Sequence, residues 1–133
     1  MPRRSNAAGG DASAFWRREG IDSQILSREE FQRYWREKHA PLVRSHAATL
    51  GIRRYVQTHT LDTPANALLR ASRGGPAEYD GVAELWWDSL EALQSASTSE
   101  AGMAAGRALL EDEKRFIDLE RSPLWLAEEL PQI

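Results

Sequence analysis

SREEFQRYWREKHAPLV, residues 27–43, is the stretch that decides the fold of this chain. Ser27 and Glu30 form a capping box, in which the Ser27 hydroxyl accepts the amide of Glu30 and the Glu30 carboxylate reaches back to the Ser27 amide. A helix is therefore predicted to begin here. Pro41 is predicted to bend it, because proline lacks an amide donor and crowds the carbonyl four residues earlier. Its inner stripe recurs at spacings of three and four, as expected for a helix that lies on a sheet: Phe31, Tyr34, Trp35, His39, Leu42, Val43 and His46.

The segments around this helix show the patterns of strands and further helices. A short candidate strand over residues 12–18 precedes it, and Gly51 ends it before a β-branched and aromatic strand over 52–59. The other predicted elements are a strand over 79–87, helices over 89–96 and 99–120, and a last strand over 124–130. The order βαββαβ predicts an α+β, ferredoxin-like domain with a four-stranded antiparallel sheet. Residues 60–78 show no clear period and are predicted to form a long loop, such as a lid or a binding loop.

Composition narrows the class of protein. A chain of 133 residues is long enough for one core, and we expect one domain over residues 11–133 behind a flexible leader at residues 1–10. The net charge of -3 is spread over interleaved acids and bases, which argues against nucleic acid as a partner. No apolar run suits a membrane span, and the absence of cysteine excludes disulfides. A cytoplasmic location is the default expectation.

The two faces of the predicted sheet differ in character. Alternation along residues 79–87 places small and apolar side chains beneath the helices, namely Gly81, Ala83, Leu85 and Trp87. The opposite face is expected to stay open unless a second subunit covers it, and it is mixed aromatic and polar, as ligand pockets are. The residues assigned to this open face are Tyr55, His59, Asp80, Glu84 and Trp86.

His59 and Asp80 form the first candidate catalytic pair. His59 ends one central strand and Asp80 begins the other, so a hairpin would bring them close at the mouth of the loop. A nearby carboxylate favours the imidazolium and fixes the tautomer, which suits proton transfer near neutral pH. Asp80 is also well suited to a plain turn role before Gly81. A Glu84 carboxylate facing a cavity would need a partner such as Arg53, or a raised pKa.

Several of these segments resemble the EthD domain family. The resemblance rests on residues 31–43, on Arg53-Arg54-Tyr55 with His59, and on YDGVAELW at 79–86. It continues with Asp112 and Phe116 in the last helix and with Glu128-Glu129 in the final strand, and it spans about residues 15–130. The first strand is shorter than in the family, and the segment after His59 is unusually rich in Ala and Arg.

The resemblance implies a homodimer in which two ferredoxin-like sheets close into a dimeric α/β barrel around ligand cavities. Its better understood relatives are cofactor-free enzymes that tailor aromatic polyketides by dehydration, cyclisation or anthrone oxygenation, while others accompany ether-degrading oxygenases. Carried over residue by residue, the family's histidine before Ala-Pro-Leu falls on His39, its strand-end histidine on His59, and its acid before Gly on Asp80.

We therefore expect a cofactor-independent, metal-independent lyase or cyclase that acts by acid/base chemistry on an aromatic, polyketide-like ligand. His59 and Asp80 are the expected catalytic residues, with His39 as the second candidate, although a histidine on an apolar helix stripe is also typical of a packed core. The expected substrate-binding residues are Tyr55, Trp86, Glu84 and Trp35, which core or interface packing would explain equally well. The alternatives are a cofactor-free oxygenase and a non-catalytic carrier of a hydrophobic ligand. A site of His39, His46 and His59 for a metal ion is disfavoured, because no acid stands at a ligand-like spacing.

Overall fold

A computed structural model describes residues 11–16 as a backbone strand and residues 26–133 with their side chains. The leader predicted at residues 1–10, and the end of the predicted first strand at residues 17–18, lie outside the described residues. The elements in chain order are β1 (Asp11–Trp16), α1 (Arg28–Tyr34), the π-helical turn η2 (Trp35–His39), α2 (Ala40–Leu50), β2 (Arg54–His59), α3 (Pro64–Arg73), β3 (Gly81–Trp86), α4 (Leu90–Thr98), α5 (Glu100–Glu113), the 3₁₀ turn η3 (Leu119–Arg121) and β4 (Leu124–Ala127).

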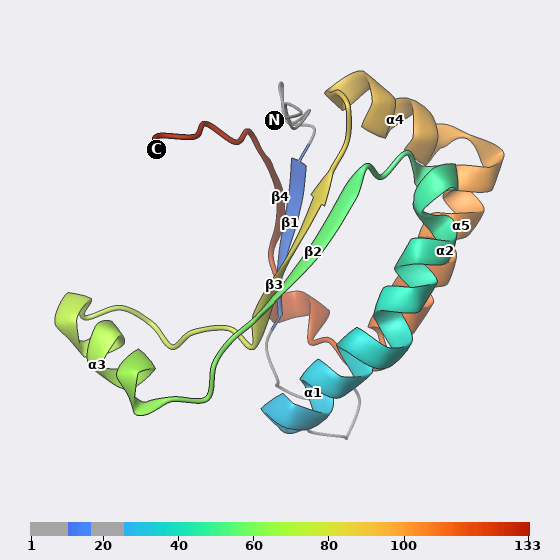
Figure 1. Cartoon of the computed structure of the whole chain (residues 1–133). Helices are drawn as coiled ribbons and strands as arrows, with labels where there is room; N and C mark the ends of the chain where they lie inside the picture. The colour runs from blue at the N-terminus through green and yellow to red at the C-terminus, as the bar shows by residue number, and fades with distance from the viewer. Residues whose placement is uncertain (1–10, 17–25) are drawn as a thin grey trace.

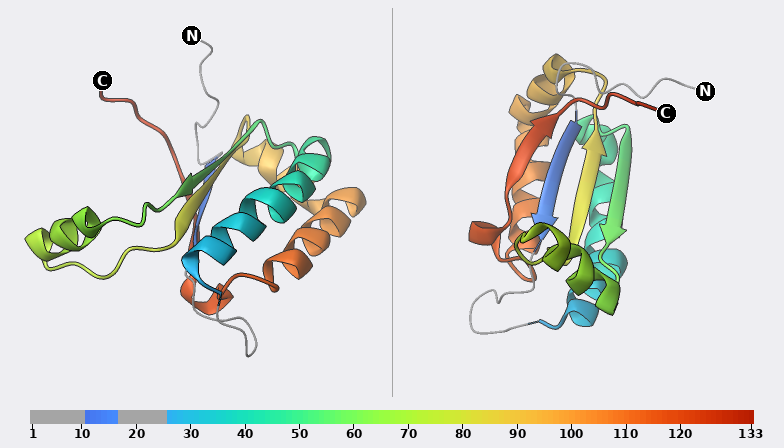
Figure 2. Two further views of the ribbon diagram at one scale, coloured as in Figure 1. Left: turned by 60° about the horizontal axis from the view of Figure 1, so that its bottom comes forward. Right: turned by 90° about the vertical axis from the view of Figure 1, so that its left-hand side faces the viewer.

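The four strands form one antiparallel sheet in the order β2-β3-β1-β4. Helices α1, α2 and α5 lie on one face of this sheet, and α3 projects from one end of the β2–β3 pair, away from those helices (Figure 1, Figure 2). None of the described helices covers the opposite face. This is the predicted ferredoxin-like α+β fold with its four-stranded antiparallel sheet. The strand that ends at His59 was expected at the centre of the sheet, but β2 lies at its edge.

The helix that starts after Ser27 begins as predicted, but one of its turns contains one residue more than a regular α-helical turn. The Ser27 hydroxyl accepts the Glu30 amide at 3.0 Å and the Glu30 carboxylate accepts the Ser27 amide at 3.3 Å. Over η2 the hydrogen bonds lengthen by one residue, so that the Ala40 amide donates to the Trp35 carbonyl. Pro41 follows at once and has no amide to donate, so the predicted distortion takes the form of a π turn.

This π turn sets which face of the helix is buried. At about 100° per residue, an unbroken α-helix would rotate Val43 by about 120° away from Phe31. The extra residue absorbed in η2 reduces this to about 20°, and Phe31, Val43 and Leu50 are all buried. Leu42 and His46, which the regular spacing placed on the inner stripe, are partly exposed instead.

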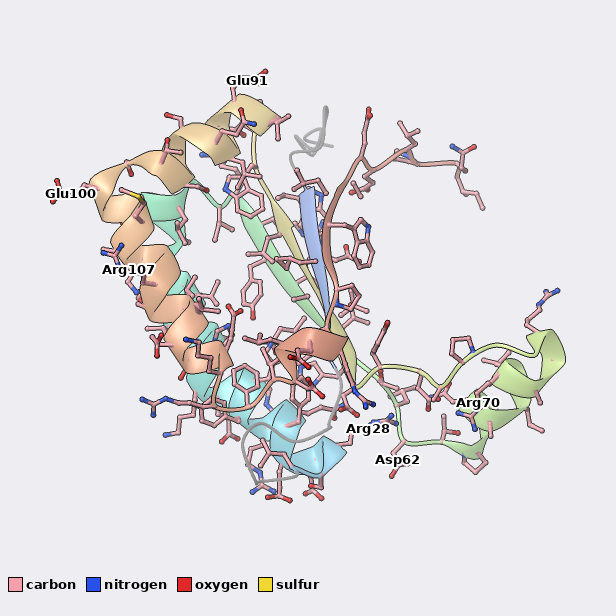
Figure 3. The ribbon with its side chains drawn as sticks, turned by 180° about the vertical axis from the view of Figure 1, so that it is seen from behind. Arg28, Asp62, Arg70, Glu91, Glu100 and Arg107 are labelled. Atoms are coloured by element: carbon pink, nitrogen blue, oxygen red, sulfur yellow. The ribbon has the colours of Figure 1, made fainter. Side chains whose placement is uncertain are left out.

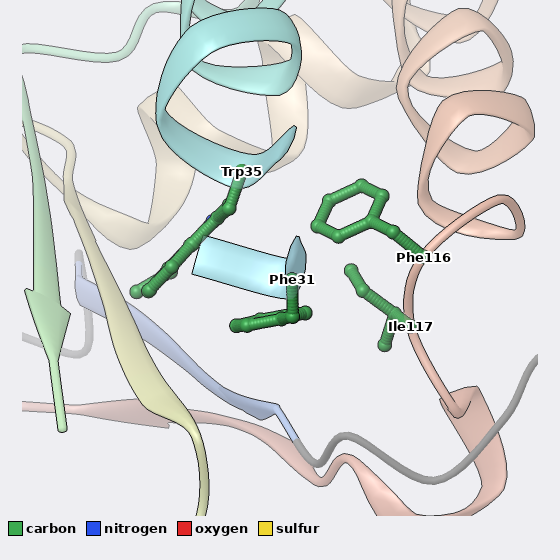
Figure 4. Close-up of a cluster of buried hydrophobic side chains, with 5 residues drawn as sticks. Phe31, Trp35, Phe116 and Ile117 are labelled. Atoms are coloured by element: carbon green, nitrogen blue, oxygen red, sulfur yellow. The ribbon is translucent and has the colours of Figure 1, made fainter. Parts of the chain in front are cut away.

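The core lies between this helix, β3 and the segment that follows α5. Phe31 and Trp35 are fully buried, and the Phe31 ring contacts the Trp35 and Phe116 rings at centroid distances of 5.3 and 5.6 Å (Figure 4). Ala83 and Ile117 complete the cluster. An added Cβ at Gly81 would stand 2.5 Å from Cζ3 of Trp35 and 2.8 Å from the Thr58 carbonyl oxygen, so only glycine lets the indole lie against β3. The predicted placement of Gly81 and Ala83 under the helices is confirmed.

Residues 60–78 are not the loop that the sequence suggested. They contain α3, whose Thr63 hydroxyl accepts the Ala65 amide, whose Pro64 occupies the first turn and whose Gly74 ends the helix with a φ of 63°. These residues are ordinary start and stop signals of a helix. None of the residues of α3 is buried, so this helix lacks the inner stripe by which the other helices were predicted. Two other elements are shorter than predicted, since α5 ends at Glu113 and β4 ends at Ala127.

No helix in the described part of the chain combines the length and the apolar character needed to cross a bilayer.

Candidate active site

His39 and Asp112 form a buried pair beneath the sheet. His39 is the last residue of η2, and its Nδ1 lies 2.8 Å from Oδ2 of Asp112, near the end of α5. Oδ1 of Asp112 accepts the Tyr34 hydroxyl at 2.6 Å. A carboxylate with both oxygens engaged keeps the His39 proton on Nδ1, which leaves the Nε2 lone pair available. The arrangement is that of a general base with an orienting acid.

Burial is the main cause of the pKa shifts of His39 and Tyr34. It lowers the pKa of His39, and Asp112 opposes that change only in part. Burial, together with the hydrogen bond to Asp112, raises the pKa of Tyr34 to about 12. His39 is therefore a neutral imidazole at neutral pH, which is the form that can accept a proton.

Glu113 stands on the other side of the His39 ring. Its Oε2 lies 3.9 Å from Nε2 of His39, so consecutive carboxylates of α5 approach the two ring nitrogens. Burial first, and the Asp112 charge second, raise the pKa of Glu113 to about 7. Its side chain keeps 24% of its surface exposed, against 4% for His39.

A second hydrogen-bonded chain runs along the helix-facing side of β2. Gln57 donates through Nε2 to the Trp35 carbonyl at 2.9 Å and to the Tyr55 hydroxyl at 2.7 Å. Because the carbonyl can only accept, the orientation of the Gln57 amide is settled, and its Oε1 accepts from Nε2 of His59 at 2.8 Å. His59 thus carries its proton on Nε2, and its Nδ1 lone pair is available.

The ring of Trp35 packs against the second chain. It stacks on the His59 ring at a centroid distance of 4.6 Å and an interplanar angle of 25°. Its indole Nε1 is fully buried and makes no well-aligned hydrogen bond within residues 26–133, although it interacts with the Tyr55 hydroxyl. Burial lowers the pKa of His59, with a further contribution from Arg36, and burial also raises the pKa of Tyr55 to about 12.

These contacts correct the predicted faces of the sheet. Tyr55 and His59 lie on the helix side, because they pair in register with Leu85 and Gly81. Only Trp86 and Glu84 keep their predicted place on the opposite face. There the Arg54 guanidinium covers the Trp86 ring at 4.7 Å and Trp86 Nε1 donates to Glu129 at 3.3 Å.

The expected pairing of His59 with Asp80 is also wrong. The described hydrogen bond of the His59 side chain goes to Gln57, whereas Oδ1 of the buried Asp80 accepts from Nε of Arg28 at 2.9 Å. Arg28 lies where the two segments leading to α3 leave the sheet, and it also reaches Glu78 at 3.7 Å (Figure 3). The Asp80 carboxylate therefore ties the start of β3 to α1. The suggested Arg53 partner for Glu84 is likewise replaced, since Arg53 pairs with Asp88 at 3.5 Å.

Sequence reasoning missed Glu113 and Gln57 and assigned no role to Asp112. The only available signals were the order of Asp112 and Phe116 in the last helix and the alternation of Gln57 between Tyr55 and His59. Within residues 26–133, no group of three potential ligand side chains is arranged to hold a metal ion.

Comparison with known proteins identifies the family and the fold. The EthD domain model matches residues 23–120. An EthD family protein from Bacillus halodurans shares 22% identity, with 90% of this chain and 97% of that chain covered and a TM-score of 0.58. An EthD-like protein from Ralstonia eutropha shares 16%, with coverages of 95% and 96% and a TM-score of 0.59. A hypothetical protein from Arabidopsis thaliana shares 11%, with coverages of 99% and 96% and a TM-score of 0.53. No curated protein matches the chain.

Proposed function

Since this chain belongs to the EthD domain family, we propose that it is a cofactor-independent enzyme that acts by acid/base chemistry on an aromatic, polyketide-like substrate. The reaction class is dehydration or cyclisation that begins with removal of a proton next to a carbonyl. The observation that carries the proposal is the pair of neutral histidines, His39 buried and His59 partly buried, whose tautomers are held by Asp112 and Gln57.

Each histidine offers one free nitrogen for proton transfer. His39 Nε2 would accept the proton of the substrate C–H bond, whose electron pair passes to the adjacent carbonyl as an enolate. The Asp112 carboxylate stabilises the imidazolium that forms. His59, which stacks on the Trp35 ring, is the second proton carrier. After taking a proton from solvent at Nδ1, it donates that proton to the hydroxyl oxygen that leaves as water in a dehydration, or to the carbonyl oxygen that becomes a hydroxyl when the enolate carbon attacks the carbonyl carbon in a cyclisation.

The indole N–H of Trp35 is compatible with the presence of a ligand, because within residues 26–133 it makes no well-aligned hydrogen bond and only interacts with the Tyr55 hydroxyl. A buried donor without a good acceptor destabilises a fold by about 1–3 kcal/mol. A bound molecule could supply that acceptor, and the oxygen of an enolate is of the required kind. Trp35 and Tyr55 would then orient the substrate, in keeping with their predicted role in binding.

A turnover experiment tests the assignment of the histidines. His39→Ala and His59→Ala are expected to lower the turnover of an aromatic polyketide intermediate by about 10²–10⁴-fold, because each removes a positioned acid or base. His46→Ala is the matched control, since His46 is a partly exposed histidine of α2 outside both hydrogen-bonded chains. Ligand binding by fluorescence and folding by circular dichroism are followed in parallel.

Three results would contradict the proposal in different ways. An equal loss of turnover in His46→Ala would show that His39 and His59 have no special role in the reaction. Oxygen uptake with each turnover would identify an oxygenase. Binding without conversion by the wild-type protein would identify a carrier.

The uncovered sheet face supports a homodimer. Trp86 and Trp125 lie on this side, and α3 projects past it with Leu68 and Leu69 exposed by 73% and 66% (Figure 1). A second copy seated on this face would bury those side chains and close the barrel. Sedimentation equilibrium is expected to give twice the chain mass of 15.0 kDa. A monomer at micromolar concentration would contradict this.

A further inference from the structure

His39 lies between two carboxylates that are not equivalent. Asp112 accepts hydrogen bonds from both His39 Nδ1 and the Tyr34 hydroxyl. The Glu113 side chain makes no hydrogen bond within residues 26–133, and its described ionic contact is the 3.9 Å approach of Oε2 to His39 Nε2. Asp112 is thus held in place, while Glu113 is free to turn about its side-chain bonds.

Exposure rises along this short series of groups. The side chains of His39, Asp112 and Glu113 are 4%, 15% and 24% exposed. The His39 ring is covered by the Phe116 ring at a centroid distance of 5.0 Å, so water does not reach it freely. Of the two carboxylates that flank His39, Glu113 has the better access to solvent.

We propose that Glu113 relays protons between Nε2 of His39 and bulk solvent. This inference rests on the proposed function, in which His39 takes a proton from the substrate and must lose it before the next turnover. Asp112 does not serve as the exit, because its oxygens already hold the Tyr34 hydroxyl and the His39 Nδ1–H.

The proton path balances in two steps. The imidazolium of His39 transfers its Nε2 proton to Oε2 of Glu113, which must first close the 3.9 Å separation by rotation or through one water molecule. The Nε2 lone pair is restored and Glu113 becomes a neutral carboxylic acid. That acid then releases the proton to water and returns to the carboxylate.

The groups around Glu113 favour this exchange at neutral pH. Asp112 of α5 and burial raise the pKa of Glu113 to about 7, so both protonation states are populated. His39 of η2 faces the Glu113 carboxylate directly. The Glu113 charge acts on the Tyr55 hydroxyl of β2, and the charge of Arg44 in α2 acts on the same hydroxyl. Lys114 is held by Glu111 at 3.0 Å, and Arg115 lies 4.0 Å from Asp112.

The direct test uses NMR of the ring nitrogens to measure how fast Nε2 of His39 exchanges its proton with solvent at a pH where part of the His39 population is protonated, which requires no substrate. Glu113→Gln is expected to slow this exchange by about tenfold or more, because the isosteric amide cannot take up and release a proton. Glu113→Asp retains a carboxyl group and is expected to recover part of the rate. Glu111→Gln, two residues earlier and on the exposed face of α5, is the matched control and is expected to leave exchange unchanged.

Turnover gives the second readout. In Glu113→Gln, kcat is expected to fall with little change in KM, the titration near pH 7 is expected to vanish from the pH profile, and small buffer acids are expected to restore the rate. An exchange rate equal to that of the wild type would overturn the relay. Slowed exchange in a protein that converts no substrate would uphold the relay and contradict the proposed function.

Discussion

Trp35→Ala is expected to lower the free energy of unfolding by about 3–5 kcal/mol, because it removes a large aromatic side chain from a site with no solvent exposure. The indole contacts Phe31 and His59 and lies against Gly81, so the cavity would open at the centre of the core. Domains of this size are stable by about 5–15 kcal/mol. The variant would therefore lose a large part of its stability.

Equilibrium unfolding in urea measures this effect, with Trp35→Phe and Leu68→Ala as the comparisons. Phenylalanine keeps a ring in the core and should lose less than alanine. Leu68 is 73% exposed on α3, and its truncation should change stability by no more than about 0.5 kcal/mol. Similar losses in Trp35→Ala and Leu68→Ala would show that the core does not centre on this indole.

The second large effect concerns the pH dependence of stability. The pKa of Glu113 rises from 4.5 to about 7 on folding, mainly through burial. The folded state therefore holds a proton that the unfolded state has released, and stability falls as pH increases between those two values. At about 1.4 kcal/mol per pKa unit, the full change is about 3 kcal/mol. Because the side chain keeps 24% exposure, we expect about 1–3 kcal/mol.

Glu113→Gln removes this titratable group, and its free energy of unfolding is compared with that of the wild type across the pH range. At pH 8 the variant should be more stable than the wild type by that amount, and at pH 4 the two should have similar stability. Glu111→Gln, on the exposed side of the same helix, should follow the wild-type curve throughout. Parallel curves for the wild type and Glu113→Gln would contradict the raised pKa.

The local signals in the sequence predicted the fold well. The capping box at Ser27 and the alternation through Gly81 and Ala83 act over a few residues, and both have their predicted roles. The contact between His39 and Asp112 could not be derived in that way, because these residues are 73 positions apart and meet only through the packing of α5. The face on which His59 lies follows from its register with Gly81, and assigning the wrong face to β2 separated it from its true neighbours.

Helix α3 was missed for a different reason. Its start and stop residues, Thr63 and Gly74, and an amphipathic arrangement of its residues were present in the sequence, yet none of its residues is buried in the part of the chain that the structure describes. Patterns of burial predict elements that contact the core. An element that projects from the fold must be recognised from its ends and from the uneven distribution of its apolar residues.

The π turn also bears on how the length of the chain can vary. Deleting one residue between Trp35 and His39 would let the segment revert to a regular α-helix. Phe31, Val43 and Leu50 would stay aligned, because the turn merely accommodates the surplus residue. His39 follows the deleted position together with Val43, so it would keep its place opposite Asp112 as well. The surplus residue is therefore one that this helix can lose without exchanging its buried face.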